Sequence, residues 1–449
     1  MGKRIAVAGA GHGGLVAAYY LACAGYDVTV YEKKAKGTLG YEQSDSVHID
    51  GFEEAGIPVP EAYRVKRTPL SFLVPELGLP PVTQGVSEDS YNVEIDRKAL
   101  YAILIGMAED AGAKMEYETE IEAPILLGSR VCGVKTNRGD IYADLVIDAA
   151  GLHSPLRTGL PEYFGIEKEA GDWNVLYAYR GYFERKPDME APALKYQVYL
   201  EPGEEAGLMW VITHETETDI LIGKFRPLSE EMIGRKLGEL REMNPHIGQK
   251  LLRGGKTAEI PLRQPLGMLV ADGYAAVGDS AFMTIPLKGS GVGYSMRAGR
   301  LLAAAVEADE NGCFTRETLW SYQHAFFENI GFDAGLLAFI KDLIPQITAE
   351  DIEYLMNEGI FSPETLQKFG NEEGLVKIVT SMGFSGLRDT AKKIVGHPNV
   401  RRMLINTGKN VAKYTLLKQN LKAKYEPKAA EKWIRAYRKF YDNVYKTED

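Results

Sequence analysis

The stretch GAGHGG at residues 9–14 decides the fold, because it separates a short apolar run from a long one. Residues 3–8 (KRIAVA) predict a β-strand, and residues 15–24 (LVAAYYLACA) predict a helix that ends at Gly25. Residues 27–32 (DVTVYE) predict a second strand with an acid at its end. This order of strand, turn, helix and strand is the context in which a Gly-x-Gly-x-x-Gly turn indicates a dinucleotide-binding unit.

The glycines at the three motif positions of this turn have separate roles. Gly9 permits the tight turn, Gly11 lets the backbone approach a pyrophosphate, and Gly14 lets the helix pack closely on the sheet. The start of the helix adds unpaired N–H groups and about half a positive charge, which attract phosphates. Glu32 is expected to accept a hydrogen bond from a ribose hydroxyl and to disfavour a 2′-phosphate at that place.

The composition is that of a globular protein with one large body or two to three domains: 45% of the 449 residues are apolar and 25% are charged. The three cysteines are too few and too scattered for a disulfide framework, a four-thiolate zinc site or an iron–sulfur cluster. The seven histidines have no metal-ligand spacing, so we expect no metal site. The net charge of −10 argues against nucleic-acid binding. Because the cysteines suggest a reducing compartment and no apolar run approaches about 18 residues, we expect a cytoplasmic protein.

A second glycine-rich turn lies far along the chain from the first. Residues 274–277 (YAAV) predict a strand that leads into Gly278 and Asp279, and residues 289–293 (GSGVG) open a helical stretch over residues 294–308. One cofactor that touches both turns must be long, with its phosphates at the first turn and a ring at the second. FAD fits this description better than a nicotinamide cofactor bound by one contiguous unit.

The order of these motifs resembles a known group of flavoproteins, the one that contains the aromatic hydroxylases and the geranylgeranyl reductases. The resemblance to the group rests on residues 9–32, 96–100 (DRKAL), 143–157 (ADLVIDAAGLHSPLR) and 274–300. The stretch VYLEPGEEAGLMWVITHETETDILIG, with Trp210 in it, resembles an aromatic segment of the reductases, and residues 318–353 resemble their helical extension. The resemblance covers most of the first 360 residues.

The resemblance implies an α/β fold: a Rossmann-like FAD-binding domain, an inserted antiparallel β-sheet substrate domain and a C-terminal helical extension. The alternation of apolar and polar residues over residues 173–261 independently predicts the inserted strands. The expected domain bounds are residues 1–165 and 266–310 for the FAD-binding domain, 166–265 for the insert, and 311–449 for a helical region with a basic terminal helix.

The resemblance also implies which residues hold FAD. The adenosine half would lie on the first turn and Glu32, Arg97 would reach the pyrophosphate, and the ring would lie beside the second turn. Arg97 could instead be a surface arginine near a helix start. The implied FAD-binding residues are Gly9, Gly11, Gly14, Glu32, Arg97, Ile121, Gly278, Asp279, Pro286, Gly289, Ser290, Gly291 and Val292.

The chain departs from the family pattern at two places. The reductases often carry a cysteine-glycine-acid segment after the second strand, whereas residues 40–45 here read GYEQSD and contain no cysteine. Tyr41 and His48 are the candidate catalytic residues, as proton donors or substrate contacts with Asp45 as an orienter, although a loop or core role would also explain them. Residues 148–151 (DAAG) depart from the Asp-Gly of the hydroxylases, which favours reduction over hydroxylation.

Five aromatic residues of the inserted strands are candidates for an apolar substrate tunnel over the flavin, and core packing is the alternative for each of them. They are Tyr177, Tyr179, Tyr196, Tyr199 and Trp210.

The C-terminal arm is basic in an acidic chain. Residues 406–446 contain eleven Lys or Arg and three Asp or Glu, and Trp433, Tyr437, Phe440 and Tyr441 share one face of the predicted helix. This pattern fits either peripheral contact with an anionic membrane or a helix packed on the acidic body with a solvated basic side.

The function predicted from these observations is an FAD-dependent oxidoreductase that reduces carbon–carbon double bonds of an isoprenoid or similarly apolar lipid. The alternatives are an FAD-dependent monooxygenase, a clusterless electron-transfer flavoprotein dehydrogenase, and a prenyl-protein binder that holds no flavin. No second Gly-x-Gly-x-x-Gly turn supplies a separate NAD(P)H domain, so the sequence identifies no electron donor.

Overall fold

Strand β1 (Arg4–Ala8) lies inside a six-stranded sheet with the order β18-β19-β12-β1-β2-β8. Neighbouring strands run parallel except at the edge, where β18 pairs antiparallel with β19. The other strands are β2 (Asp27–Tyr31), β8 (Lys114–Glu116), β12 (Leu145–Asp148), β18 (Val270–Ala271) and β19 (Tyr274–Ala276). Every residue of β12 and β19 is buried, as expected for parallel strands that are covered on both faces.

The computed structural model describes most of the chain. The described residues are 2–445 without 88, 172, 203–205, 287–288, 344–345, 360–361, 364–387, 389–390, 392–393 and 395–396, and side chains are described up to residue 442.

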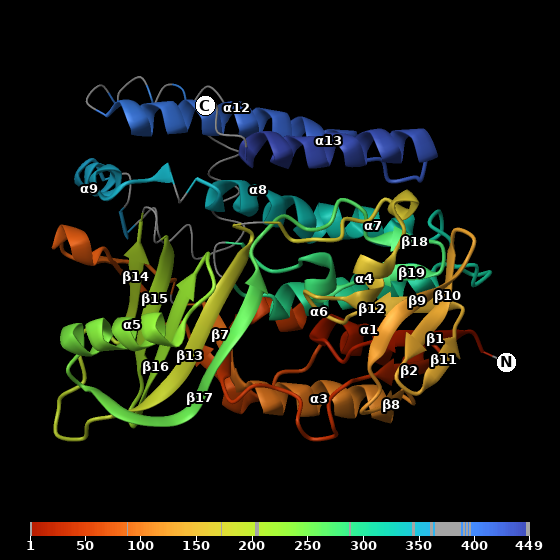
Figure 1. Cartoon of the computed structure of the whole chain (residues 1–449), viewed down its shortest axis with the longest axis horizontal. Coiled ribbons are helices and arrows are strands. Elements are labelled where there is room, and N and C mark those ends of the chain that lie inside the picture. Colours follow the sequence, from red (N-terminus) through yellow and green to blue (C-terminus); the bar gives the residue numbers. More distant parts are fainter. Residues whose placement is uncertain are drawn as a thin grey trace.

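Three helices, α1, α3 and α6, belong to the nucleotide-binding part of the fold (Figure 1). Helix α1 follows β1 directly and packs against both of the others. Their bounds are α1 (His12–Cys23), α3 (Arg97–Asp110) and α6 (Val292–Glu307). Two short helices, α2 (Asp50–Glu53) and α4 (Pro155–Gly159), and an antiparallel sheet of β9 (Ile121–Leu127), β10 (Arg130–Thr136) and β11 (Gly139–Tyr142) complete this part.

A seven-stranded sheet with the order β17-β13-β16-β15-β14-β5-β6 stands beside the first sheet (Figure 1). It is antiparallel except where β5 pairs parallel with β14. Its strands are β5 (Ser71–Leu73), β6 (Val82–Thr83), β13 (Val175–Arg185), β14 (Tyr196–Glu201), β15 (Gly207–Thr213), β16 (Glu217–Lys224) and β17 (Ile247–Pro261). Helix α5 (Glu230–Met243) covers one face, where Leu237 and Leu240 join the buried residues of the strands.

A small antiparallel sheet contributes further walls of the region between the two large sheets. It has the order β3-β7-β4, with β3 (Ser44–His48), β4 (Arg64–Lys66) and β7 (Tyr91–Asp96). Strand β7 leads directly into α3, because the Asp96 side chain caps the helix by accepting hydrogen bonds from the backbone N–H groups of Lys98 and Ala99. The connections include the 3₁₀ turns η1 (Glu61–Tyr63), η2 (Pro75–Leu77), η3 (Glu162–Phe164) and η5 (Gly278–Ala281).

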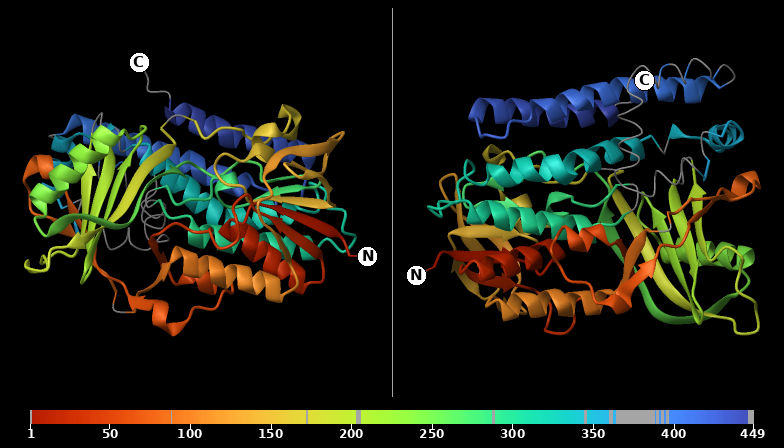
Figure 2. Two further views of the ribbon diagram at one scale, coloured as in Figure 1. Left: turned by 60° about the horizontal axis from the view of Figure 1, so that its bottom comes forward. Right: turned by 180° about the vertical axis from the view of Figure 1, so that it is seen from behind.

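The C-terminal helices form two further layers on top of this body (Figures 1 and 2). The inner layer runs from α7 through a π-helical turn into α8, and α12 and α13 form the outer layer. Their bounds are α7 (Trp320–Phe326), the π-helical turn η6 (Phe327–Gly331), α8 (Phe332–Lys341), α9 (Ala349–Asn357), α12 (Pro398–Asn420) and α13 (Pro427–Tyr445).

The aromatic face of α13 packs inward. Trp433, Tyr437, Phe440 and Tyr441 are buried, and the ring of Phe327 lies 5.0 Å from the ring of Trp433 and 5.4 Å from that of Tyr437. The predicted aromatic stripe is therefore part of the core, and it is not available to a membrane.

The predicted fold class is confirmed: a Rossmann-like α/β domain, several sheets and a C-terminal helical region. The exact domain bounds stay a prediction. Among the residues that the structure describes, no helix combines the length and the apolar character needed to cross a bilayer.

Candidate functional site

The first glycine turn is shaped by close contact with Ala149 at the end of β12. A Cβ at Gly9 or at Gly11 would lie 2.7 or 2.9 Å from the carbonyl oxygen of Ala149, so neither position accepts a side chain. A Cβ at Gly14 would lie 2.6 Å from the Ala149 Cβ, and its absence lets α1 pack closely on the sheet. The N-terminus of α1 is thereby held at the carboxyl end of β1, where it can meet a phosphate.

Glu32 is buried at the end of β2 and fixes the same turn. Its Oε2 accepts a hydrogen bond from the backbone N–H of Ala10 at 3.0 Å, and its Oε1 accepts one from the backbone N–H of Lys34 at 2.9 Å. Each carboxylate oxygen has about two lone-pair positions, so capacity remains for a hydroxyl ligand.

The two glycine-rich turns meet in space although they are far apart in the sequence. Helices α1 and α6 cross closely: a Cβ at Gly13 would lie 2.6 Å from the carbonyl oxygen of Ser295, and a Cβ at Gly299 would collide with the carbonyl oxygen of Gly13. Small residues at this crossing therefore bring the starts of both helices to one place. This is the arrangement that a single extended cofactor requires.

One cavity of about 2020 Å³ runs along both turns. Small-molecule pockets usually measure about 300–1,000 Å³, so this cavity has room for a long cofactor and a second ligand. All but one of the residues predicted for the cofactor and for catalysis line it, the exception being Gly14, which lies behind the wall. The lining residues among them are Gly9, Gly11, Glu32, Tyr41, His48, Arg97, Ile121, Gly278, Asp279, Pro286, Gly289, Ser290, Gly291 and Val292.

The second turn presents a carboxyl group and a helix start to the cavity. The Thr284 hydroxyl donates a hydrogen bond to Asp279 Oδ1 at 3.1 Å. Burial raises the pKa of the Asp279 carboxyl, while Thr284 and Arg97 act in the opposite direction. Gly291 is the N-cap of α6 and contributes no side-chain hydrogen bond, so first-turn N–H groups are left for a ligand.

Arg97, the first residue of α3, is held by Asp45. Its Nε and Nη2 donate hydrogen bonds to the two carboxylate oxygens of Asp45, each at 2.6 Å. We expected from the sequence that Asp45 would orient Tyr41 or His48, but its partner in the structure is Arg97. His48 Nδ1 lies 3.1 Å from an oxygen of Asp50 instead, and Tyr41 is 39% exposed beside Arg97, whose guanidinium lies 5.6 Å from the ring centre.

One face of the seven-stranded sheet forms an apolar wall of the cavity. Because side chains alternate along a strand, residues in register across the sheet share a face. One such row is apolar across four strands and then reaches two cationic residues, on β13 and β17. The row is Phe72, Val198, Trp210, Leu221, Arg180 and Lys256, all of which line the cavity.

The opposite face of this sheet packs against α5. Part of the tunnel prediction is therefore wrong. Tyr179 and Tyr199 are buried there with Leu240, so they are core residues and not cavity residues. Tyr177, Tyr196 and Trp210 line the cavity. The period-2 pattern predicted the strands, but it did not say which of the two faces meets the cavity.

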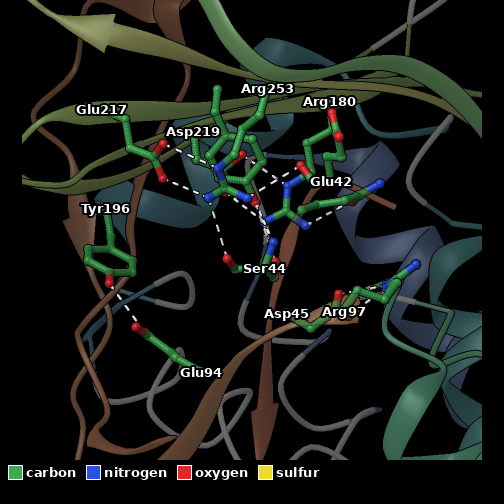
Figure 3. Close-up of polar contacts among 12 residues, drawn as sticks. Glu42, Ser44, Asp45, Glu94, Arg97, Arg180, Tyr196, Glu217, Asp219 and Arg253 are labelled. Carbon is green, nitrogen blue, oxygen red and sulfur yellow. Dashed lines mark hydrogen bonds and ion pairs between the residues drawn. The ribbon is translucent and has the colours of Figure 1, made fainter. Parts of the chain in front are cut away.

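A charged network on the cavity side escaped the sequence analysis. Arg180 pairs with Asp219, and Arg253 pairs with Glu217, both arginines reaching the segment of residues 42–45 (Figure 3). One signal was available: Arg180 interrupts the otherwise apolar run LYAYRGYF of a buried strand. Among the described residues, no group of three or more His, Cys, Asp or Glu side chains is placed to hold a metal ion.

The C-terminal helices line a further part of the cavity, mostly with apolar side chains. Lys341 of α8 and Thr407 of α12 are polar residues in this lining. The apolar residues include Leu337, Ile340, Ile347, Ile352, Leu355, Met403 and Leu404.

Comparison with curated proteins finds relatives that match most of the chain in sequence. The chain is 23% identical over 378 residues to the digeranylgeranylglycerophospholipid reductase of Sulfolobus acidocaldarius, with 81% of this chain and 82% of the relative covered. It is 25% identical over 387 residues to digeranylgeranylglycerophospholipid reductase 1 of Methanopyrus kandleri, with 84% of this chain and 98% of the relative covered. The chain is therefore similar, along most of its length, to proteins named as digeranylgeranylglycerophospholipid reductases. The predicted resemblance is thereby confirmed, and residues 7–50 also match the NAD(P)-binding Rossmann-like domain model.

Solved structures agree at the level of the fold. A geranylgeranyl bacteriochlorophyll reductase-like protein of Thermoplasma acidophilum superposes with a TM-score of 0.72 at 18% identity, covering 90% of this chain and 99% of that one. A probable FAD-dependent monooxygenase from Pseudomonas aeruginosa superposes with a TM-score of 0.59 at 18% identity, covering 80% and 100%.

Proposed function

We propose that this protein is an FAD-dependent oxidoreductase that reduces carbon–carbon double bonds of an isoprenoid or similarly apolar lipid. One observation carries the proposal: a single cavity joins two glycine-rich turns to a chamber with apolar walls. The curated relatives are named for the reduction of a digeranylgeranyl lipid, whose chains are isoprenoid.

The residues around the first part of the cavity fit FAD. The turn at Gly9 and Gly11 has no space for a Cβ, which suits a backbone that approaches phosphates. Glu32 would accept from ribose hydroxyls, and Asp279 would accept from the hydroxyls of the ribityl chain. The N-terminus of α6 would face the ring and favour negative charge on it, by about 1 kcal/mol for a charge at a helix terminus.

When bound, FAD supplies the hydride. The sheet wall around Trp210 and Leu221 would hold an apolar chain against the cofactor and exclude water from the reacting bond. Reduction of a double bond also needs a proton, for which Tyr41 and His48 remain the predicted donors, since both line the cavity.

The test is turnover without oxygen. Purified protein loaded with FAD and reduced by dithionite is incubated with a geranylgeranyl lipid, and the product is expected to gain two hydrogens per reduced double bond by mass spectrometry. A product that forms only in air and contains an added oxygen would establish the monooxygenase instead. Protein that takes up no FAD would contradict the flavoenzyme proposal as a whole and revive the flavin-free binder.

We also propose that the basic surface of α12 and α13 contacts anionic membranes. The aromatic side of α13 is buried, so the contact would be electrostatic, at about 1 kcal/mol per basic residue near the surface. Helix α12 also contributes Met403 and Leu404 to the cavity lining, and this supports a membrane contact close to the proposed lipid site. The exposed basic residues include Arg401, Arg402, Lys409, Lys413, Lys428, Lys432 and Lys439.

Charge reversal tests this contact better than deletion, because removing α13 would also remove buried core residues. The triple variant of Lys428, Lys432 and Lys439 to Glu is expected to lose cosedimentation with vesicles that contain phosphatidylserine. The control reverses three exposed lysines elsewhere, Lys36, Lys135 and Lys250, and keeps the same net charge. Equal binding by both triple variants would remove the proposal.

A further inference from the structure

The segment Glu42–Asp45 lies between the seven-stranded sheet and the start of α3, and it is bound from both sides (Figure 3). From the sheet side, the Arg253 guanidinium lies 3.4 Å from the ring centre of Tyr182 and donates to the Glu42 carbonyl oxygen at 3.3 Å. The backbone N–H of Ser44 donates to the Tyr182 hydroxyl at 2.9 Å. This segment precedes His48 and borders the cavity, so its position matters to the site.

Arg180 is the central donor on the sheet side. Its Nε and Nη2 donate to the two oxygens of Asp219 at 3.0 and 2.7 Å, and Asp219 is buried. Nη2 also donates to the Ser44 carbonyl oxygen at 2.8 Å, and Nη1 donates to Gln43 Oε1 at 3.2 Å. A planar guanidinium can make these contacts together, whereas a lysine ammonium at the same place cannot.

Gln43 connects this donor to the cofactor side. Its side chain accepts from Arg180, and its backbone carbonyl accepts from the backbone N–H of Arg97 at 3.0 Å. Two residues further on, Asp45 accepts both hydrogen bonds of the Arg97 fork. Arg97 is thus oriented through its backbone and its side chain by one short segment that Arg180 holds.

The charged side chains of Arg180, Asp45 and Arg97 also influence one another directly. Burial by itself would raise the pKa of Asp45, but Arg97, and after it Arg180, bring that pKa below the ordinary value. Burial by itself would lower the pKa of Arg97, but Asp45 brings that pKa above its ordinary value, although Arg180 acts in the same direction as burial. The order Asp219, Arg180, Asp45, Arg97 alternates in sign from the substrate sheet to the start of α3, so a change at one end is felt at the other.

We propose that Arg180 is a positioning residue that sets Arg97 for the cofactor through Gln43 and Asp45, and so couples the substrate sheet to FAD binding. The inference rests on the proposed function, because it assumes that FAD is the cofactor. Arg180 also lies over Trp210, with 5.1 Å between its guanidinium and the ring centre. A ligand on the sheet wall around Trp210 would therefore lie close to Arg180 as well.

A double-mutant cycle on FAD affinity tests the coupling. The dissociation constant of FAD is measured by quenching of flavin fluorescence for the full-length apoprotein and for Arg180→Lys, Asp45→Asn and the double variant. We expect Arg180→Lys to weaken FAD binding about tenfold, and to change it less than about twofold when Asp45→Asn is already present. Residues that act independently would give the same factor in both backgrounds.

The matched control is Arg241→Lys. Arg241 belongs to α5, and its guanidinium lies 5.0 Å from the ring centre of Phe183, which is buried on the outer face of the sheet. We expect this variant to leave FAD affinity unchanged and to be additive with Asp45→Asn. It shows whether the loss of any guanidinium packed against this sheet is enough to disturb the cofactor site.

A second variant guards against poor folding of Arg180→Lys. Gln43→Met removes only the side-chain acceptor and keeps the backbone bond to Arg97, and we expect it to weaken FAD binding about threefold while the apoprotein still unfolds cooperatively, at a melting temperature only slightly below that of wild type. If wild type binds FAD and both Arg180→Lys and Gln43→Met bind it equally well, the positioning role is wrong. If wild type itself binds no FAD, the proposed function fails first.

Discussion

Glu32 combines a structural and a ligand role on one carboxylate, which makes its replacement informative. In Glu32→Gln an amide NH₂ faces a backbone N–H that now binds a carboxylate oxygen, either at Ala10 or at Lys34. We expect the free energy of unfolding to fall by about 1–3 kcal/mol and FAD affinity to fall at least about tenfold. Urea unfolding and FAD titration measure the two effects.

Glu116→Gln is the control for Glu32→Gln, because Glu116 ends the neighbouring strand and is exposed. It should change neither quantity by more than about 0.5 kcal/mol. Normal FAD affinity in Glu32→Gln would show that this carboxylate does not hold the ribose.

At the residue scale, the sequence predicts what is local. Gly9, Gly11 and Glu32 lie within one supersecondary unit, so their spacing in the sequence was enough to predict how they are arranged in the structure. The pairing of Arg180 on β13 with Gln43, in the connection before β3, joins residues 137 positions apart, and no spacing rule reaches that far. For the same reason the sequence suggested neighbouring residues as the partners of Asp45, whereas its partner is Arg97 at the start of α3, 52 positions away.

At the element scale, strand alternation leaves one binary choice open. Residues 198 and 199 point to opposite faces in any register, but only the packing of α5 decides which of these faces becomes core. Val198 lines the cavity, and Tyr199 is buried under the helix. For α13 the sequence left a different choice open, because an aromatic stripe on a polar helix can either pack into the core or contact a lipid. In the structure this stripe packs into the core.

The two faces of the sheet predict opposite responses to the same substitution. Val198→Trp adds volume to the cavity, so we expect stability within about 1 kcal/mol of wild type, FAD affinity within about twofold, and a KM for the geranylgeranyl lipid at least about tenfold higher. Val211→Trp adds the same bulk to the fully buried cluster under α5, and we expect it to cost about 3 kcal/mol of stability or to prevent folding.

Thermal unfolding, FAD titration and steady-state kinetics on these two variants separate the faces. An unchanged KM in Val198→Trp would mean that the apolar chain does not lie on this wall. A stable Val211→Trp would mean that α5 covers the sheet less tightly than its buried residues indicate.

At the scale of the whole molecule, the cofactor would join segments that the chain folds separately. FAD should therefore slow amide hydrogen exchange at both residues 9–14 and residues 289–293, whereas ADP, which lacks the ring, should protect only the first. At about 100 times its dissociation constant FAD should add about 2.7 kcal/mol to the free energy of unfolding. Protection of only one turn by FAD would contradict the single extended binding mode.

Acid should loosen the C-terminal layer through Glu167, which ties α13 to the body. Glu167 accepts from Arg263 at 2.7 Å and from the backbone N–H of Gly267 at 2.9 Å, and Arg438 of α13 lies 3.5 Å away. Burial alone would raise the pKa of Glu167, but these partners, Arg263 first, bring it below its ordinary 4.5. Because the folded-state pKa is the lower one, the stabilisation is fully present above about pH 4.5 and is lost as the pH falls through the folded-state value.

Glu167→Gln isolates this contribution. At neutral pH the variant should be about 3 kcal/mol less stable than wild type, since two buried or half-buried arginines lose their carboxylate. The difference in stability should shrink as the pH falls below about 4.5, because the wild-type carboxyl then takes up a proton and, like the glutamine, carries no charge. Urea unfolding at several pH values measures both, with Glu426→Gln as the exposed control in the connection before α13. A difference that stays constant down to acid pH would mean that packing around the side chain, and not its charge, holds the terminal helix on the body.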